Sequence, residues 1–261
     1  MVPILEEIPI LSYHKITSQA EFGLNTLPPR RFQEQMNYLK EQDFHPVTFQ
    51  DLLTQKIPQH PIIITFDDGY SSVYQEAFPI LKELGFRAVI FIISDYIGKI
   101  NSWDANLFAI KFSHLDESQI TALAAAGMEI GSHGVSHRAL TFLTAKELEY
   151  ELCHSREILT SLSGKAIESF AYPFGIQDIT IQLAVQRAGY KFACINVWGS
   201  RNGSNHYCLP RLPVYRMDSL NSFKQKLNPG WRKQLEILKL RLCSWPAFLT
   251  PLYQKFFKKL Y

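Results

Sequence analysis

The sequence predicts an α/β protein in which parallel strands form a barrel or an open sheet. Short apolar runs of strand length alternate about seven times with segments of helical spacing, and the pattern contains no internal repeat. The chain of 261 residues can bury a substantial core, and no stretch rich in glycine, serine and proline divides its body. We therefore expect one domain over residues 8–223, followed by a basic helical tail over residues 224–261.

The first part of the chain alternates expected strands with expected helices. Strands are expected at residues 9–14, 44–47 and 62–66, and helices at residues 28–42, 48–53 and 71–84. The helix at 28–42 carries apolar residues at helical spacing. Thr48 can cap the short helix that follows it, and Gly85 can end the helix at 71–84.

The same alternation continues to residue 214. Strands are expected at residues 87–93, 128–133, 169–172, 190–195 and 208–214, and helices at residues 118–126, 144–162 and 179–188. Thr144 and Glu147 have the spacing of a capping box at the start of the longest helix. Residues 101–115 form an aromatic-rich insertion between two of these units.

The charge of the chain is divided unevenly. The formal net charge is +3, but residues 224–261 hold nine lysines and arginines against one acid, so the tail carries about +8. Two of its segments, 231–245 and 251–260, combine apolar residues at helical spacing with basic residues. Such helices bind membrane surfaces, and a helix pair packed on the domain fits the same pattern equally well. No dispersed basic face points to nucleic acid.

The remaining composition is that of a cytoplasmic protein. The four cysteines are widely spaced and form no Cys-x-x-Cys pair, so we expect neither a zinc knuckle nor a disulfide framework. Residues 1–9 lack the basic and apolar regions of a signal peptide, and no apolar run is long enough to span a membrane. Secretion stays open if the natural start of the chain lies further upstream.

Two adjacent aspartates, Asp67 and Asp68, follow the strand at residues 62–66. Gly69 then lets the backbone turn sharply. The carboxyl ends of parallel strands are where ligands bind in α/β barrels and sheets. Taken alone, an Asp-Asp-Gly turn is more often structural than functional. Beside a second motif of the same kind, one carboxylate can bind a cation while the other handles protons.

That second motif is a pair of histidines, His133 and His137, after the strand at residues 128–133. Their spacing allows both to reach one metal ion. With an aspartate from another strand end they would give three protein ligands to a divalent metal and leave a position open for water. This is the pattern of a hydrolytic site, in which the metal lowers the pKa of water toward neutrality.

Three motifs in this order resemble those of the polysaccharide deacetylase family, also called the NodB-homology domain or carbohydrate esterase family 4. They are Thr-Phe-Asp-Asp-Gly at 65–69, His-x-x-x-His at 133–137 and Tyr-Pro-Phe-Gly at 172–175, and the resemblance covers roughly residues 8–215. It implies a distorted (β/α)7 barrel. It also implies an enzyme that removes N-acetyl groups from a sugar or glycan with a divalent metal, most often zinc.

The resemblance further implies roles for residues of this chain. Asp68, His133 and His137 would ligate the metal, and Asp67 would be the general base for the attacking water. The backbone N–H of Phe174 would stabilise the oxyanion that forms on the acetamide carbonyl. Four residues at the strand ends are expected to contact the substrate: Tyr70, Tyr172, Pro173 and Trp198.

The chain departs from the family at two points. Many members have an arginine that steadies the catalytic aspartate, where this chain has Ala171, and the late Leu-x-His motif that supplies a general acid is absent. Ser-Tyr-His-Lys-Ile at 12–16 and Ala-Tyr-Pro-Phe-Gly at 171–175 are similar to the branch that deacetylates poly-N-acetylglucosamine. We therefore expect His14 to be the general acid and Arg211 to pair with Asp67.

Other functions stay open at this point. A sugar-binding barrel without catalysis would suit the two departures, and an O-acetyl esterase or a small-molecule amidohydrolase could use the same residues. For Arg211 the alternative is an ordinary surface arginine or an ordinary salt-bridge arginine. The sequence specifies neither the glycan and its length, nor the metal, nor the oligomeric state.

Overall fold

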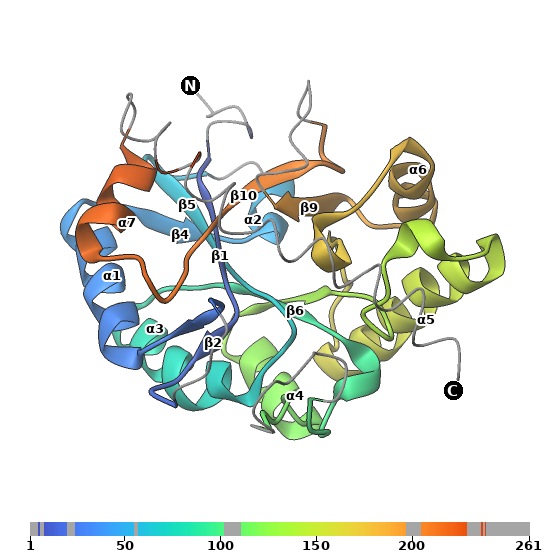
Figure 1. The fold of residues 1–261 in the computed structure, drawn as a ribbon, viewed down its shortest axis with the longest axis horizontal. Coiled ribbons are helices and arrows are strands. Elements are labelled where there is room, and N and C mark those ends of the chain that lie inside the picture. Colours follow the sequence, from blue (N-terminus) through green and yellow to red (C-terminus); the bar gives the residue numbers. More distant parts are fainter. Residues whose placement is uncertain are drawn as a thin grey trace.

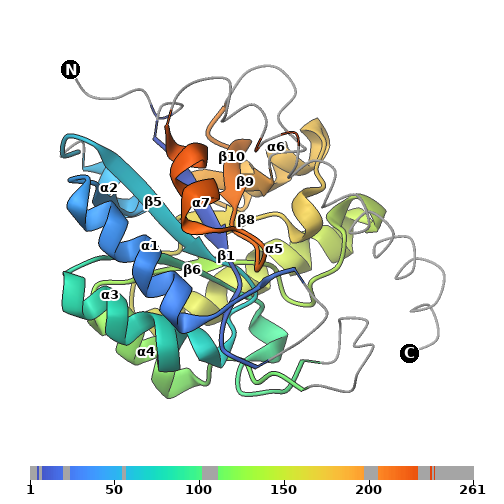
Figure 2. The same ribbon diagram turned by 60° about the vertical axis from the view of Figure 1, so that its left-hand side comes forward.

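The fold is a barrel of seven parallel strands surrounded by helices (Figures 1 and 2). The computed structural model describes residues 8–19, 24–54, 57–101, 111–196 and 205–228, together with Leu5, Glu236 and Leu238. The barrel strands are β1 (Ile10–Tyr13), β5 (Pro61–Phe66), β6 (Val89–Ile92), β7 (Glu129–Ser132), β8 (Ser169–Ala171), β9 (Phe192–Asn196) and β10 (Leu209–Pro213). Because β1 pairs with both β5 and β10, the sheet closes on itself. The predicted distorted (β/α)7 barrel is confirmed.

An eighth strand, β4 (His45–Val47), explains why the barrel is distorted. Ile63 of β5 pairs with Ile10 of β1 and also with Val47 of β4, so β1 and β4 lie on opposite edges of β5. Thr65 of β5 pairs with Val89 of β6, on the same edge as β4. Along one edge of β5, the first half of the strand therefore pairs with β4 and the second half pairs with β6.

Helices cover the outside of the barrel and alternate with its strands (Figure 1). They are α1 (Pro29–Glu41), α3 (Phe78–Leu84), α4 (Glu117–Ala125), α5 (Ala145–Ser163), α6 (Ile179–Arg187) and α7 (Leu220–Leu227). The capping box predicted for Thr144 and Glu147 is present at the start of α5. Gly85 ends α3 in the left-handed conformation, as predicted.

Apolar residues fill the amino-terminal half of the barrel. The short helix α2 (Phe49–Leu53) sends Phe49 into this layer, where its ring stacks on Phe192 at a centroid distance of 5.4 Å. Phe91 of β6 lies beside it, with ring centroids 6.4 Å apart. This packed floor leaves the polar chemistry to the opposite, carboxyl-terminal end of the strands.

The structure adds to the predicted elements in three places. The helix expected at 71–84 begins with a wider π-helical turn, Val73–Ala77, because Pro79 has no N–H to continue the regular pattern. A small parallel pair, β2 (Lys15–Ile16) and β3 (Thr26–Leu27), was not predicted. Helix α7 was not predicted either, and it runs across residue 223, where the sequence places the end of the domain.

Helix α7 is tied to the barrel through a buried ion pair. The Lys226 ammonium is fully buried, donates to the Asp218 carboxylate and to the Pro213 carbonyl oxygen, and lies beyond the predicted domain end. Apart from Glu236 and Leu238, the predicted amphipathic segments 231–245 and 251–260 lie outside the described residues. In the part of the chain that is described, no helix combines the length and the apolar character needed to cross a bilayer.

Candidate active site

The polar residues singled out in the sequence meet at the carboxyl-terminal rim of the barrel. Asp67 and Asp68 follow β5, the two histidines follow β7, and His14 follows β1. All barrel strands are parallel, so their carboxyl ends open on the same side. Residues separated by more than a hundred positions are thereby brought together.

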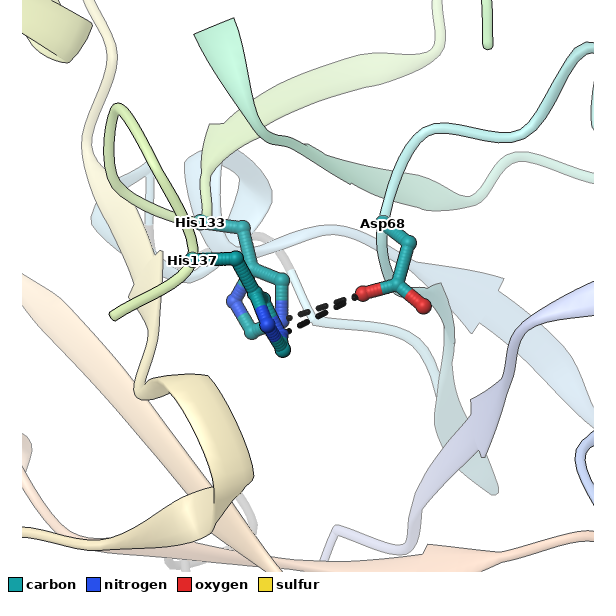
Figure 3. A group of neighbouring side chains, drawn as sticks. All are labelled: Asp68, His133 and His137. Carbon is teal, nitrogen blue, oxygen red and sulfur yellow. Dashed lines mark ion pairs between the residues drawn. The ribbon is translucent and has the colours of Figure 1, made fainter. Parts of the chain in front are cut away.

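Asp68, His133 and His137 form a compact buried group (Figure 3). Asp68 Oδ1 lies 3.5 Å from His133 Nε2 and 3.6 Å from His137 Nε2, and the three side chains are at most 5% exposed. His133 Nδ1 lies 2.7 Å from the Ala171 carbonyl oxygen. Because that oxygen can only accept, Nδ1 carries a proton, and Nε2 is the ring nitrogen that faces Asp68.

The charges and donor atoms of this group suit a divalent cation. Burial would raise the pKa of Asp68, but the His133 hydrogen bond and the nearby imidazoles outweigh it and hold that pKa well below its usual range. Burial and the charge of His133 lower the pKa of His137 to about 3. Burial would lower the pKa of His133, but Asp68 and Asp67 outweigh it and raise that pKa, so a metal ion would take the place of the Nε2 proton. The group then offers a carboxylate oxygen and imidazole nitrogens, which are ligands of zinc and similar metals.

The distances within the group also fit one small ion. Two ligands of a tetrahedral ion with bonds of about 2.1 Å lie about 3.4 Å apart. The oxygen–nitrogen separations of 3.5 and 3.6 Å are close to that value. The hydrogen bond from His133 to a backbone carbonyl is the kind of outer contact that orients metal-binding histidines.

Asp67 is held by a different partner, Arg211 of β10. The guanidinium makes a two-pronged contact, with Nη1 2.6 Å from Oδ1 and Nη2 2.7 Å from Oδ2. Burial would raise the pKa of Asp67, but Arg211 outweighs it and holds that pKa below the ordinary value. The pairing expected from the sequence is therefore present, and Arg211 is a buried residue, not a surface one.

Two further contacts fix the Arg211 side chain. Its Nη1 also donates to Thr65 Oγ1 at 3.1 Å, and its guanidinium lies 5.5 Å from the centre of the Phe91 ring. The side chain is 1% exposed, so its contact with Asp67 is shielded from water. Ala171, at the position where many members of the resembling family have arginine, supplies only its carbonyl oxygen to His133.

His14 lies on the other side of Asp67. Its Nε2 is 3.8 Å from Asp67 Oδ2, and its side chain is 18% exposed, more than that of Asp68, His133 or His137. Burial lowers the pKa of His14, although Asp68 and Asp67 pull it upward. His14 is thus a partly open imidazole next to the carboxylate that faces Arg211.

Backbone strain gathers at this site. Five non-glycine residues have a positive φ in the described part of the chain, and Asp68 (68°), His137 (57°) and Phe174 (61°) are three of them. Such conformations cost about 1–3 kcal/mol each and persist where the surroundings hold them. The Phe174 ring lies edge-on to His137, with centroids 4.6 Å apart, so strained segments after β5, β7 and β8 converge.

The residues expected to contact substrate differ in their surroundings. Tyr70 is 2% exposed and its ring stacks on His114 at 4.7 Å. Tyr172 is 1% exposed, packs in the layer between barrel and helices, and donates its hydroxyl to the Tyr207 carbonyl oxygen. Pro173 is buried, and Trp198 lies outside the described residues. The Tyr70 and Tyr172 side chains therefore serve the core, and their contact with substrate stays a prediction.

Two residues near the site were missed by sequence reasoning. His114 Nδ1 lies 2.8 Å from the carbonyl oxygen of Asp68, and nothing in the aromatic-rich insertion signals this contact. Glu151 of α5 is 3% exposed and accepts hydrogen bonds from the loop that carries His137. It could have been found, because Leu148, Leu152 and Leu159 define a buried stripe that includes position 151.

Comparison with known proteins agrees with the fold and the motifs. The sequence model of the polysaccharide deacetylase family matches residues 54–193, which is more than half of the chain. This chain is a member of the polysaccharide deacetylase family. The poly-β-1,6-N-acetyl-D-glucosamine N-deacetylase of Staphylococcus aureus is 26% identical over 228 residues, covering 78% of this chain and 77% of that protein. A Bacillus subtilis protein described as a candidate polysaccharide deacetylase is 29% identical over 214 residues, covering 80% and 71%.

Solved structures share the barrel of this deacetylase-family chain. A polysaccharide deacetylase from Bacillus cereus superposes with a TM-score of 0.72 at 24% identity, covering 85% of this chain and 69% of that one. A deacetylase from Streptococcus pyogenes in complex with acetate superposes with a TM-score of 0.71 at 22% identity, covering 85% and 98%. At this level of identity the structural likeness establishes the fold.

Proposed function

We propose that this protein is a metal-dependent hydrolase that removes N-acetyl groups from an N-acetylated sugar or glycan. The observation that carries the proposal is the separation of two adjacent carboxylates into two environments. Asp67 lies against Arg211 at 2.6 and 2.7 Å, while Asp68 faces His133 and His137 at 3.5 and 3.6 Å. A carboxylate held by arginine and another held among imidazoles can carry out different steps of one reaction.

Asp68, His133 and His137 would hold the metal, and zinc is the expected ion. When bound, a divalent cation polarises a carbonyl oxygen and makes water acidic enough to attack at neutral pH. The protein's contribution is to keep three donor atoms within 4.8 Å of one another and to fix the His133 ring through the Ala171 carbonyl oxygen. The strained φ of Asp68 turns its carboxylate away from Arg211 and toward the histidines.

Asp67 would be the general base. Arg211 keeps this carboxylate ionised and in one orientation, so an oxygen is ready to accept a proton from the attacking water. The acetamide carbonyl then becomes tetrahedral, and its oxygen gains negative charge. The backbone N–H of Phe174 would stabilise that charge, since Phe174 packs against His137 at the same rim.

His14 would be the general acid for the leaving amine. Its Nε2 lies 3.8 Å from Asp67 Oδ2, which leaves a short path for a proton between the base and the departing nitrogen. Its 18% exposure supports this role, because a general acid needs contact with the bound sugar. The C–N bond breaks, acetate forms from the acetyl group and the attacking water, and the sugar is released as a free amine.

Sequence similarity to a known N-deacetylase supports an N-acetylated glycan as the substrate class. The Staphylococcus aureus relative is named for N-deacetylation of poly-β-1,6-N-acetyl-D-glucosamine. We propose that this chain likewise acts on an amide, with O-acetyl ester cleavage and sugar binding without catalysis as the outcomes to be excluded.

The test is release of acetate from N-acetylglucosamine oligomers, peptidoglycan and acetylated glycolipids, with added zinc and with a chelator. We expect acetate and an equal amount of free amine, both abolished by chelation and by Asp67→Asn. Acetate without amine would indicate an esterase. Measurable sugar binding with no acetate from any substrate would overturn the proposal in favour of a silent barrel.

A further inference from the structure

The loop that carries the two histidines is attached to helix α5 by one buried carboxylate. Glu151 Oε2 accepts a hydrogen bond from the Val135 N–H at 2.6 Å and from the Ser136 N–H at 3.0 Å. Glu151 Oε1 accepts a very short hydrogen bond from the Ser136 hydroxyl. Three donors of the segment between His133 and His137 thus converge on a single side chain.

Other polar groups of this loop are held by residues outside helix α5. The Gly134 and Val135 carbonyl oxygens accept from the Ser94 and Asp95 N–H groups at 3.1 and 3.0 Å. The Gly134 N–H donates to Ser132 Oγ at 3.2 Å. Glu151 is therefore the residue from helix α5 that adds to these contacts, by accepting from the Val135 and Ser136 N–H groups.

Close approach of the helix to the loop requires a glycine. Gly134 has φ of +81°, and a Cβ there would lie 2.9 Å from Glu151 Oε2. His137, three residues later, has the strained φ of +57°. A conformation of that kind persists only when surrounding contacts hold it, and the Glu151 contacts lie immediately before it.

The buried Glu151 carboxylate makes no ion pair with the described residues. The residue is 3% exposed, and within the described ranges no lysine, arginine or histidine lies within ion-pair distance of its carboxylate. A buried carboxylate is costly unless hydrogen bonds satisfy it. Its partners here are the loop donors, so its position on the buried face of α5 serves the loop and not a surface salt bridge.

We infer that Glu151 is a positioning residue for the metal site, holding His137 where it can share an ion with His133 and Asp68. This inference rests on the metal site of the proposed function. Charge-assisted hydrogen bonds are about twice as strong as neutral ones, so a carboxylate fixes the loop better than an amide of the same shape. Outer contacts of this kind typically change metal affinity about 10- to 100-fold when removed.

The test measures zinc affinity of the full-length, metal-free protein by competition with a chromophoric chelator. Glu151→Ala is expected to weaken zinc binding about 10- to 100-fold, and Glu151→Gln, which keeps the shape, by less. Ser136→Ala removes one donor and keeps the carboxylate, so it tests the same contact if the alanine variant at 151 does not fold.

Leu152→Ala is the matched control. Leu152 is the neighbouring residue on α5, is 1% exposed and belongs to the apolar core, so its truncation destabilises the same helix without touching the loop. Wild-type zinc affinity is expected for this variant. The absorption spectrum of bound Co²⁺ adds a second readout, because it reports ligand geometry: it should change in the Glu151 variants and stay unchanged in Leu152→Ala.

The outcomes separate this inference from the proposal beneath it. Wild-type protein that binds no zinc would overturn the metal site itself, and the inference with it. Tight zinc binding by the wild type and equally tight binding by Glu151→Ala, or by Ser136→Ala if the alanine variant at 151 does not fold, would overturn the inference alone. Equal weakening in Leu152→Ala would also overturn it, because loss of helix stability would then explain the effect.

Discussion

Replacing Arg211 by methionine is expected to damage both stability and catalysis, for separable reasons. The guanidinium and the Asp67 carboxylate are 1% and 4% exposed, so the pair is removed from water. Methionine fills a similar volume but leaves the carboxylate buried without its partner. Breaking a buried pair in this way costs about 3–5 kcal/mol of folding free energy.

The fall in kcat expected for Arg211→Met has a separate cause from the loss of stability. Without two hydrogen bonds from Arg211, the Asp67 carboxylate is free to rotate and easier to protonate, so it is a poorer base. General acid–base catalysis contributes about 10²- to 10⁴-fold to a rate, and we expect kcat to fall within that range. Arg211→Lys should fall between wild type and methionine, because an ammonium keeps the charge but cannot make the two-pronged contact.

A double variant separates the two effects. Arg211→Met combined with Asp67→Asn leaves no uncompensated charge in the barrel, so stability should recover relative to Arg211→Met. Activity should stay low, because the base is gone. The measurements are urea unfolding and the initial rate of acetate release at saturating zinc. Wild-type kcat for Arg211→Met would refute the role of Arg211, and a double variant no more stable than the single one would refute the account of its stability.

Three other measurements bear on the site, the barrel floor and the tail. Burial raises the pKa of Glu129 to about 7, so stability falls as pH rises from the ordinary carboxyl pKa to that value, where the unfolded chain is ionised and the folded Glu129 is still protonated. Between pH 5 and 8 the wild type should lose roughly 2.5 kcal/mol relative to Glu129→Gln in unfolding experiments, and a constant difference would contradict this. His14→Ala should lower kcat about 10²-fold or more with unchanged zinc content, and retention of most activity would remove His14 as the acid. The full-length chain with Lys255, Lys258 and Lys259 changed to glutamate should co-sediment less with anionic liposomes; equal sedimentation would leave the packed helix pair as the explanation of the tail.

The sequence was sufficient to predict which polar residues meet at the carboxyl-terminal rim of the barrel. Each of these strands is visible as an apolar run, and the polar residues follow it directly. An apolar run followed by Asp67 and Asp68 marks a strand end as well as a chemical group, and His133 follows its own strand in the same way. In a parallel barrel the carboxyl ends face one side, so the sequence pattern was enough to bring these residues together.

Other features depend on closure of the sheet and could only be hypotheses. Arg211 reaches Asp67 because β10 and β5 both pair with β1, a relationship between residues 144 positions apart that no local pattern encodes. Leu220, Phe223 and Leu227 have helical spacing, yet helix α7 was not predicted. Its last turn contains Lys224 and Lys226, which were counted with the basic tail. The buried Lys226 shows that a basic residue counted with a tail can belong to the core.

The division of labour between Asp67 and Asp68 has a structural cause in the backbone. Asp67 continues the direction of β5, which points its side chain into the barrel toward Arg211, whereas Asp68 adopts a left-handed φ of 68° and turns to β7. Neighbouring carboxylates in one environment would repel each other and share a proton. Here each is compensated by groups from a different strand, so both have pKa values below the ordinary range. The strain at Asp68 is therefore the local cost, of about 1–3 kcal/mol, of keeping two adjacent carboxylates ionised side by side.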